Sequence, residues 1–562
     1  MTPKCLAKLS SAQQRMTRPK IRPAYWRVQL RRTAIVVSAL ILTLPAASRE
    51  SRSLIGVWLI QPTSPPGVVV HESLTFFPSE GQIAGKFDEV GRRKTYDGAV
   101  REVVVDGDSV SFKVQREWGQ LVWEGHFDSD NELLMESFYV GSSNELVPLE
   151  TRVARRSSAG EVAREAEEVP RNLILKKMPL PPLRDLPSNG LAPTPPMGWS
   201  SWNTFKETID EKTVREAADA LVSSGAREAG YTIVEVDDGW QGKRDDSGVL
   251  HPNSKFPDME ALVHYIHSKG LKFGIYTAIG SVSCAGYVGS HGYEVQDAQT
   301  FAAWGADFVM NDLCGGKEIY KTRAELQALH QKMAEALRST ARPIIYKIHD
   351  AVDLFPDSRD GLKSWGRAVG ANLWRTGDDL VFGERWKAVS TRFDKDGNPA
   401  DAGPGGWNDA DNLVIGVDSG IPAFVPLTPD ESRTHMTLWS ILASPLILGN
   451  DVRKMTGEVK EILLNAEVIA VDQDRLGKQG RRVLKNGNME VWVKPLSGGA
   501  SAVALFNRGE DEATLTVKWA DIGLQGNHRL RDLWHRRDLD DGHPDRYSAR
   551  VAAHGCVLLR VQ

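Results

Sequence analysis

Residues 231–240 have the sequence Tyr231-Thr232-Ile233-Val234-Glu235-Val236-Asp237-Asp238-Gly239-Trp240. An apolar run of strand length comes first, and two carboxylates and a glycine follow it at once. Seven more strand-like runs lie between residues 192 and 476 and alternate with helical stretches such as Glu211–Ser223, Met259–Ser268, Ala298–Trp304 and Arg323–Ser339. Eight such units in about 280 residues favour a (β/α)8 barrel over an open sheet. The other expected strands are Met197–Trp199, Lys272–Tyr276, Asp307–Asn311, Pro343–Ile348, Ala371–Arg375, Asn412–Ile415 and Pro445–Leu448.

The segments on either side of this barrel have a different sequence pattern. Residues 55–155 consist of short alternating strands with turns, which indicate an antiparallel β-sandwich or a small β-barrel that binds carbohydrate or serves as a spacer. Residues 157–191 form a linker, and eight of the 29 prolines lie between 157 and 196. From residue 477 to 562 the strands become short again and predict a C-terminal β-sandwich.

The first 48 residues have the features of a secretory signal peptide. They carry nine Lys and Arg and no acid, and they include the apolar run Ala34–Leu44 followed by Pro45-Ala46-Ala47-Ser48. The run is shorter than the roughly 20 residues of a membrane span. We expect export to the periplasm or the exterior, without a membrane anchor after cleavage, and Arg31-Arg32 leaves the twin-arginine route open beside the general one.

The charge and the cysteines exclude several functions. Loss of the nine leader charges changes the net charge from −4 to −13, which makes nucleic acid an unsuitable partner. Cys5 would be lost with the leader, Cys284 and Cys314 could pair across a loop, and Cys556 would stay free. Because the chain has no Cys-x-x-Cys or His-x-x-x-His spacing, we expect no zinc, and no other metal or cofactor is indicated.

The ends of the expected strands are unusually acidic. Carboxylates follow strands two, four and six, and the segment Trp407–Asp411 precedes strand seven, while Tyr276 and His349-Asp350 end strands three and five. A single Asp in such a place is usually a helix cap or a turn residue. Several of them beside aromatic rings at one barrel face suit a divalent cation or glycoside hydrolysis, and the 16 Trp favour a sugar.

Several motifs, in a fixed order along the chain, indicate a known family. The chain resembles glycoside hydrolase family 27, the α-galactosidases (melibiases) and α-N-acetylgalactosaminidases, over about residues 192–480 and in the C-terminal sandwich, but not over 55–155. The motifs are Pro195–Phe205, Val236–Trp240, Cys284-Ala285-Gly286, Asp297–Phe301, Trp374–Asp379, Gly406–Asp411 and Ser444–Asp451.

The resemblance implies a retaining mechanism with a carbohydrate substrate and no catalytic metal. Asp312 would be the nucleophile, and Asp379, with Asp378 as the alternative, would be the acid/base, a role that asks for a raised pKa. It further implies a disulfide between Cys284 and Cys314 beside the nucleophile. The sugar contacts that it implies are Trp202 and Tyr276 as pocket wall and Asp237, Asp238, Arg375 and Asp411.

Two positions depart from the family pattern. Met310 stands where the family has a Lys two residues before the nucleophile, and His349 replaces the Glu that contacts the sugar at its 2-position. We therefore expect an exported retaining α-glycosidase, with α-galactosidase as the default. The alternatives are a relative with another sugar, such as a β-L-arabinopyranosidase or an isomaltodextranase-like enzyme, and a non-catalytic carbohydrate-binding protein. The sequence does not indicate an oligomeric state.

Overall fold

The computed structural model describes residues 53–60, 71–90, 96–116, 119–140, 146–162, 176–349, 365–377, 379–380, 385–395, 399–417, 425–539 and 544–562. The expected signal peptide and Asp378 lie outside these residues. Within them, no helix is both long enough and apolar enough to cross a membrane.

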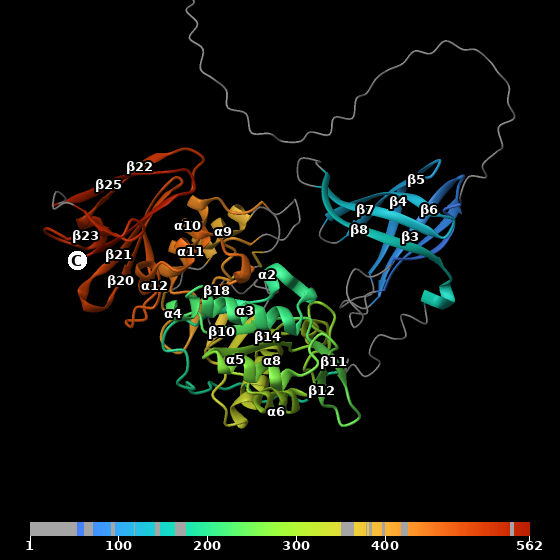
Figure 1. Cartoon of the computed structure of the whole chain (residues 1–562), viewed down its shortest axis with the longest axis horizontal. Helices are drawn as coiled ribbons and strands as arrows, with labels where there is room; N and C mark the ends of the chain where they lie inside the picture. Colours follow the sequence, from blue (N-terminus) through green and yellow to red (C-terminus); the bar gives the residue numbers. More distant parts are fainter. Residues whose placement is uncertain are drawn as a thin grey trace, which may run out of the picture. The chain divides into compact units, whose positions relative to one another are not determined.

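The first body of strands is a closed antiparallel barrel (Figure 1). Each strand pairs with the next along the chain, and β1 closes the barrel by pairing with β8. This closure shows that the domain is a small β-barrel and not a sandwich, the two alternatives that the sequence left open. The apolar core of the barrel includes Trp58, Leu74, Phe112 and Trp123. Its strands are β1 Gly56–Ile60, β2 His71–Ser79, β3 Gln82–Val90, β4 Tyr96–Asp106, β5 Ser109–Arg116, β6 Gly119–Ser129, β7 Glu132–Val140 and β8 Leu146–Ser157.

The central body is the expected barrel of eight parallel strands. Its order around the sheet is β17-β16-β15-β14-β13-β10-β9-β18, and a single bridge joins Leu448 of β18 to Leu413, which follows β17 in the chain. Helices alternate with the strands along the chain, and their apolar faces join one large core. The strands are β9 Met197–Ser200, β10 Ile233–Val236, β13 Lys272–Ala278, β14 Phe308–Asp312, β15 Ile345–His349, β16 Leu373–Arg375, β17 Trp407–Asp409 and β18 Leu446–Leu448.

Several helices of this body begin after a side chain that accepts a hydrogen bond from one of their first backbone N–H groups. Asp210 caps α3, Asp258 caps α5, and Thr322 and Thr428 form capping boxes with the third residues of α8 and α10. The helices are α2 Trp202–Phe205, α3 Glu211–Ser223, α4 Ala226–Ala229, α5 Met259–Ser268, α6 Glu294–Trp304, α7 Gly316–Ile319, α8 Arg323–Ser339, α9 Arg385–Lys395, α10 Pro429–Leu442, α11 Gly457–Leu463 and α12 Ala466–Asp472.

The prediction for the seventh strand was wrong. Residues 412–415 are not that strand; β17 is Trp407–Asp409, which pairs with β16 through Trp407 and Leu373. The apolar run misled the prediction because residues 413–415 are buried although they form no strand apart from the single bridge of Leu413. As a consequence, Asp409 ends its strand and Asp411 follows it, at the same barrel end as the other carboxylates.

The described part of the proline-rich linker, from residue 176 on, is extended and lies against the barrel. The backbone N–H of Met178 donates to Tyr320 Oη at 2.7 Å, and that of Arg184 donates to Gln331 Oε1 at 3.0 Å, which attaches the linker to α8 and the turn before it. Leu186 is buried in the main barrel core. The linker is therefore part of the outer surface of the barrel.

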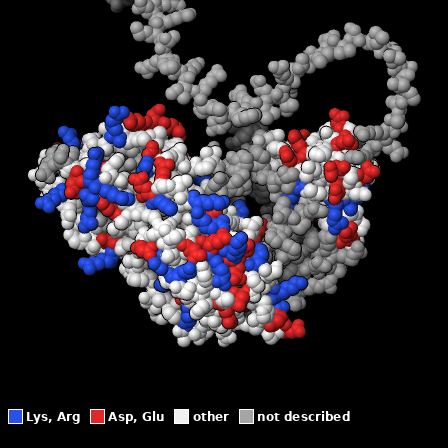
Figure 2. All heavy atoms as spheres, viewed as in Figure 1, with Lys and Arg blue, Asp and Glu red and all other residues white. Residues whose placement is uncertain are grey.

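The C-terminal body has two antiparallel sheets, of order β19-β20-β21-β26-β23-β24 and β22-β25. On the face that Figure 2 draws, Lys and Arg are interspersed with Asp and Glu over the described residues. The free Cys556 is half-buried, with its Sγ 3.2 Å from Thr437 Oγ1 of α10. The strands are β19 Arg481–Asn486, β20 Met489–Pro495, β21 Ser501–Asn507, β22 Ala513–Lys518, β23 Leu530–Asp532, β24 Arg537–Asp538, β25 Arg546–Val551 and β26 Cys556–Val561.

Candidate active site

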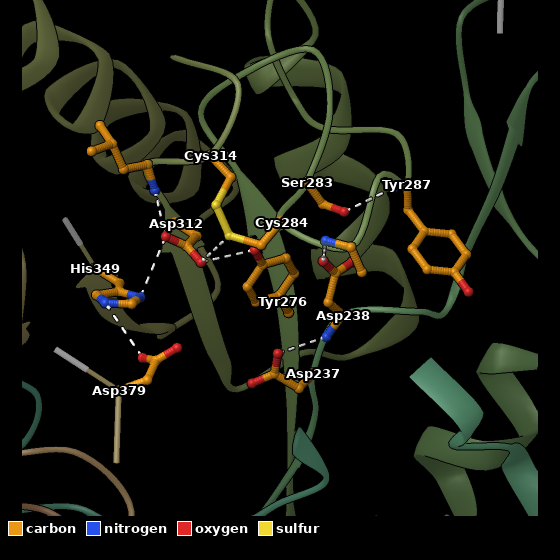
Figure 3. Close-up of a disulfide and its surroundings, with 12 residues drawn as sticks. Asp237, Asp238, Tyr276, Ser283, Cys284, Tyr287, Asp312, Cys314, His349 and Asp379 are labelled. Carbon is orange, nitrogen blue, oxygen red and sulfur yellow. Dashed lines mark hydrogen bonds and ion pairs between the residues drawn. A yellow bond between two sulfur atoms is a disulfide. The ribbon is translucent and has the colours of Figure 1, made fainter. Parts of the chain in front are cut away.

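The expected site residues that the structure describes lie at or after the carboxyl ends of the barrel strands, and Figure 3 shows Asp237, Asp238, Asp312, His349 and Asp379 among them. Asp312 is the last residue of β14 and lies beside Ala278 of β13 and His349 of β15 in the register of the sheet. Arg375 ends β16, and Asp237 and Asp238 follow β10 directly. A parallel barrel brings all its strand ends to one face, so residues far apart in sequence meet there.

Asp312 is held in a buried and well-defined orientation. Its Oδ1 accepts a hydrogen bond of 2.7 Å from the backbone N–H of Leu313, and its Oδ2 accepts one of 2.9 Å from Tyr276 Oη. His349 Nδ1 lies 3.3 Å from Oδ1. Only 8% of the Asp312 side chain is exposed, so protein groups and not bulk water fix the carboxylate.

The disulfide between Cys284 and Cys314 confirms the expected pairing. Cys284 Sγ lies 2.9 Å from Asp312 Oδ2, and because a disulfide sulfur carries no proton, this is a packing contact and not a hydrogen bond. The two sulfurs and the carboxylate lie close enough together to suggest a metal site, but the disulfide removes both thiolate ligands. Its effect is to fix the loop that carries Cys284 against the end of β14.

Asp379 lies on the other side of His349. The imidazole Nε2 is 3.8 Å from Asp379 Oδ1, and Arg375 donates to the same oxygen at 3.0 Å. The Asp379 side chain is 31% exposed, so it reaches toward the entrance while Asp312 stays inside. Burial raises the pKa of Asp379, but Arg375 and then His349 outweigh it, and the pKa is lowered. The expectation of a raised pKa was therefore wrong for the site without a sugar.

Arg375 also binds Asp411, at 3.1 Å from Oδ2. Asp411 has a φ of 90°, which is unusual for a residue with a side chain, and its two oxygens accept from the backbone N–H groups of Leu380 and Asn412, each at 2.7 Å. These bonds compensate the backbone strain and attach the Asp379 loop to the end of β17.

Asp237 and Asp238 form a buried acidic pair on the opposite side of the site. Asp238 Oδ2 accepts from the backbone N–H of Ala285 at 2.7 Å and Oδ1 from Gln241 at 3.1 Å. Burial raises the pKa of Asp238 to about 6 against the effect of these donors. Burial and the neighbouring Glu235 raise the pKa of Asp237 well above its ordinary value.

Trp202, the expected pocket wall, is the first residue of α2. Its half-buried ring packs with Ala285 and Tyr287, in the same loop whose backbone binds Asp238. Tyr276 packs with Met310 in the apolar interior of the barrel, below its contact with Asp312. Trp202 therefore lies on the side of the site that the acidic pair occupies, whereas Tyr276 lies against the nucleophile.

One buried cation near the site was not predicted from the sequence. Lys347 of β15 is 1% exposed, and its Nζ lies 2.9 Å from Asp409 Oδ2. Burial lowers the pKa of Lys347, but Asp409 and Glu235 outweigh it, so the pKa is raised. Lys347 is also the partner of Met310 in the sheet register, so it lies on the strand next to the one where the family has its Lys. A single Lys inside the apolar run Ile344–Ile348 was the available signal.

This site combines paired carboxylates, one inside and one near the entrance, with buried acids and aromatic rings on the end of a parallel barrel. Such an arrangement defines a glycoside hydrolase. Comparison with known proteins agrees. The family described as α-galactosidase A matches residues 194–474, and its C-terminal β-sandwich domain matches residues 486–561. The chain belongs to this family, glycoside hydrolase family 27.

Three similar proteins illustrate the range of the family. α-Galactosidase 3 of Arabidopsis thaliana is 42% identical over 66% of this chain and 82% of its own length. α-Galactosidase I from Mortierella vinacea, a crystal structure, has a TM-score of 0.60 and 33% identity over 66% of this chain and 98% of its own. A β-L-arabinopyranosidase from Geobacillus stearothermophilus has a TM-score of 0.58 and 25% identity over 66% and 97%.

Proposed function

We propose that this glycosidase is a retaining α-galactosidase that removes terminal sugars through a covalent intermediate on Asp312. The observation that carries the proposal is the placement of Asp312 and Asp379 on opposite sides of one imidazole, one carboxylate buried and the other partly exposed. A retaining glycosidase needs one carboxylate that attacks the sugar and another that exchanges a proton with the leaving group and with water.

In the first step, Asp312 attacks the anomeric carbon while the bond to the leaving oxygen breaks and that oxygen takes a proton from Asp379. Leu313 N–H and Tyr276 Oη hold the attacking carboxylate in one orientation, so no side-chain rotation is needed at the moment of reaction. In the second step, water attacks the anomeric carbon, gives its proton to Asp379 and releases Asp312.

The buried acids would bind the sugar hydroxyls. Asp237 and Asp238 lie across the site from Asp379, and Trp202 offers an apolar surface beside them. Arg375 and Asp411 would complete the pocket on the other side. Met310 and His349 change two positions that touch the sugar in the family pattern, and the relative that hydrolyses β-L-arabinopyranosides makes this sugar the second candidate.

The test is a panel of 4-nitrophenyl glycosides with the purified chain. Release of nitrophenol from the α-D-galactoside supports the proposal, whereas turnover of the β-L-arabinopyranoside or an α-glucoside alone would replace it by the corresponding enzyme. The Asp312→Asn variant should lose nearly all activity and keep its fold. Sugar binding without turnover of any glycoside would indicate that the chain is a non-catalytic carbohydrate-binding protein.

We further propose that residues 1–48 are a signal peptide and that the chain is exported. In this proposal the catalytic domain is residues 192–476, the linker is 157–191, and the accessory β domains are 55–155 and 477–562. N-terminal sequencing of the protein recovered from the culture medium or the periplasm tests the cleavage. An N-terminus near residue 49 is expected, and an intact leader would contradict it.

A further inference from the structure

His349 occupies an unusual place between the two reacting carboxylates. It is the last residue of β15 and lies beside Asp312 in the register of the sheet. Its Nδ1 is 3.3 Å from Asp312 Oδ1, its Nε2 is 3.8 Å from Asp379 Oδ1, and its side chain is 15% exposed (Figure 3). A protonated imidazole has an N–H at each ring nitrogen, so here the Nδ1 proton lies near Asp312 and the Nε2 proton is available to Asp379.

The charged groups around this ring favour its protonated form. Among the described residues, Asp312 faces it from β14, Asp379 and Arg375 from the end of β16, and His330 from α8. Burial and Arg375 oppose the charge, but the two carboxylates outweigh them and raise the pKa of His349. His330 stays neutral because burial lowers its pKa to about 3.

The proposed mechanism needs a proton that Asp379 does not hold in the sugar-free site. Arg375 and His349 both favour its ionised form, although a general acid has to begin the reaction protonated. Of the described groups that contact Asp379, the imidazolium of His349 is the one that carries a proton and can lose it, since Arg375 keeps its charge. The 3.8 Å separation is longer than a hydrogen bond, and such contacts commonly tighten when substrate is bound.

We propose that His349 stores the proton that Asp379 delivers to the leaving group. The inference rests on the proposed retaining mechanism and deepens it. As Asp312 bonds to the anomeric carbon, the proton passes from Nε2 to Asp379 and from Asp379 to the leaving oxygen, whose bond to the sugar breaks. In the second step, water adds to the anomeric carbon, its proton returns through Asp379 to Nε2, and Asp312 leaves as a carboxylate.

The contact of Nδ1 with Asp312 determines when the proton leaves Nε2. While Asp312 is ionised, its negative charge 3.3 Å away stabilises the imidazolium. Once Asp312 becomes an ester, that stabilisation is lost and the proton moves more easily toward Asp379. When hydrolysis restores the carboxylate, the imidazole regains its affinity for a proton. The charge of the nucleophile therefore controls the proton of the acid/base.

A comparison of leaving groups separates this role from simple binding of the sugar 2-hydroxyl. The full chain and its His349→Gln variant are assayed for kcat/KM on two substrates with one sugar: a 2,4-dinitrophenyl glycoside, whose leaving group needs no proton, and a methyl glycoside, which does. The sugar is the one that the nitrophenyl panel identifies. We expect a loss of about 100-fold on the methyl glycoside and less than about fivefold on the dinitrophenyl glycoside. Asp379→Asn should show the same pattern.

The pH profile gives a second readout. Because the pKa of His349 is raised, we expect the basic limb of kcat/KM on the methyl glycoside to lie above the ordinary imidazole value of about 6.5 in the natural chain and to move to lower pH in His349→Gln. If that variant does not fold, His349→Asn serves instead, because it also removes the titrating imidazole without adding a charge, and it should move the limb in the same direction. Equal losses on both substrates, or an unmoved basic limb, would overturn the inference. Absence of all turnover in the natural chain would instead reject the proposed function.

Discussion

Tyr276→Phe tests whether the hydrogen bond to Asp312 keeps the nucleophile ionised. The phenol donates to Oδ2 at 2.9 Å, and the two residues are 1% and 6% exposed, so water cannot easily replace the donor. A hydrogen bond to a charged group contributes about 1.5–3 kcal/mol, which corresponds to about 1–2 pH units. Its removal disfavours the carboxylate relative to the acid. The acid limb of kcat/KM should therefore move to higher pH by about that amount.

The assay is the rate of nitrophenol release between pH 3 and pH 8 on the best substrate of the panel. Tyr346→Phe is the matched control, because it also removes a buried phenolic oxygen. That oxygen accepts from the side-chain amide of Asn311 and donates to the carbonyl oxygen of His330. The control should lose some stability and keep its acid limb. An unmoved limb in Tyr276→Phe, or an equal movement in Tyr346→Phe, would refute the reasoning.

Three more predictions concern the buried charges and the disulfide. Lys347→Met should lower the free energy of unfolding by about 3 kcal/mol or more, because it leaves Asp409 buried without its cation, and Lys347→Arg should lose less in the same thermal denaturation. Replacing Cys284 and Cys314 by Ala should cost about 3–4 kcal/mol through the freed loop, and a melting temperature equal to that of the natural chain would contradict this. Because the pKa of Asp238 is about 6, inhibition by the free sugar should weaken as the pH falls below 6, and Asp238→Asn should abolish that dependence.

Much of the fold followed from local patterns. The run that ends in Asp312 combines a buried strand with a polar last residue, and the helix at Arg323–Ser339 begins with a capping box, so both could be predicted from neighbouring residues alone. β17 could not, because Trp407-Asn408-Asp409 has no apolar run, and its burial depends on the strands around it.

The site was predictable in composition but not in its contacts. The positions of the acids at strand ends brought Asp312, Asp379, Asp237, Asp238 and Asp411 together. The contact of His349 with both carboxylates depends on the register between β14 and β15, which sequence periodicity does not specify. Lys347 was missed for a different reason, because its partner Asp409 lies on β17, the strand that the sequence pattern did not predict.

The most direct test of the central claim is to trap the covalent intermediate. The chain is incubated with the slowly hydrolysed 5-fluoro glycosyl fluoride of its sugar, digested with pepsin and analysed by mass spectrometry. The proposal predicts one modified peptide, with the sugar attached to Asp312, and a first-formed product that keeps the anomeric configuration of the substrate. A label on another carboxylate, or an inverted product without any label, would contradict it.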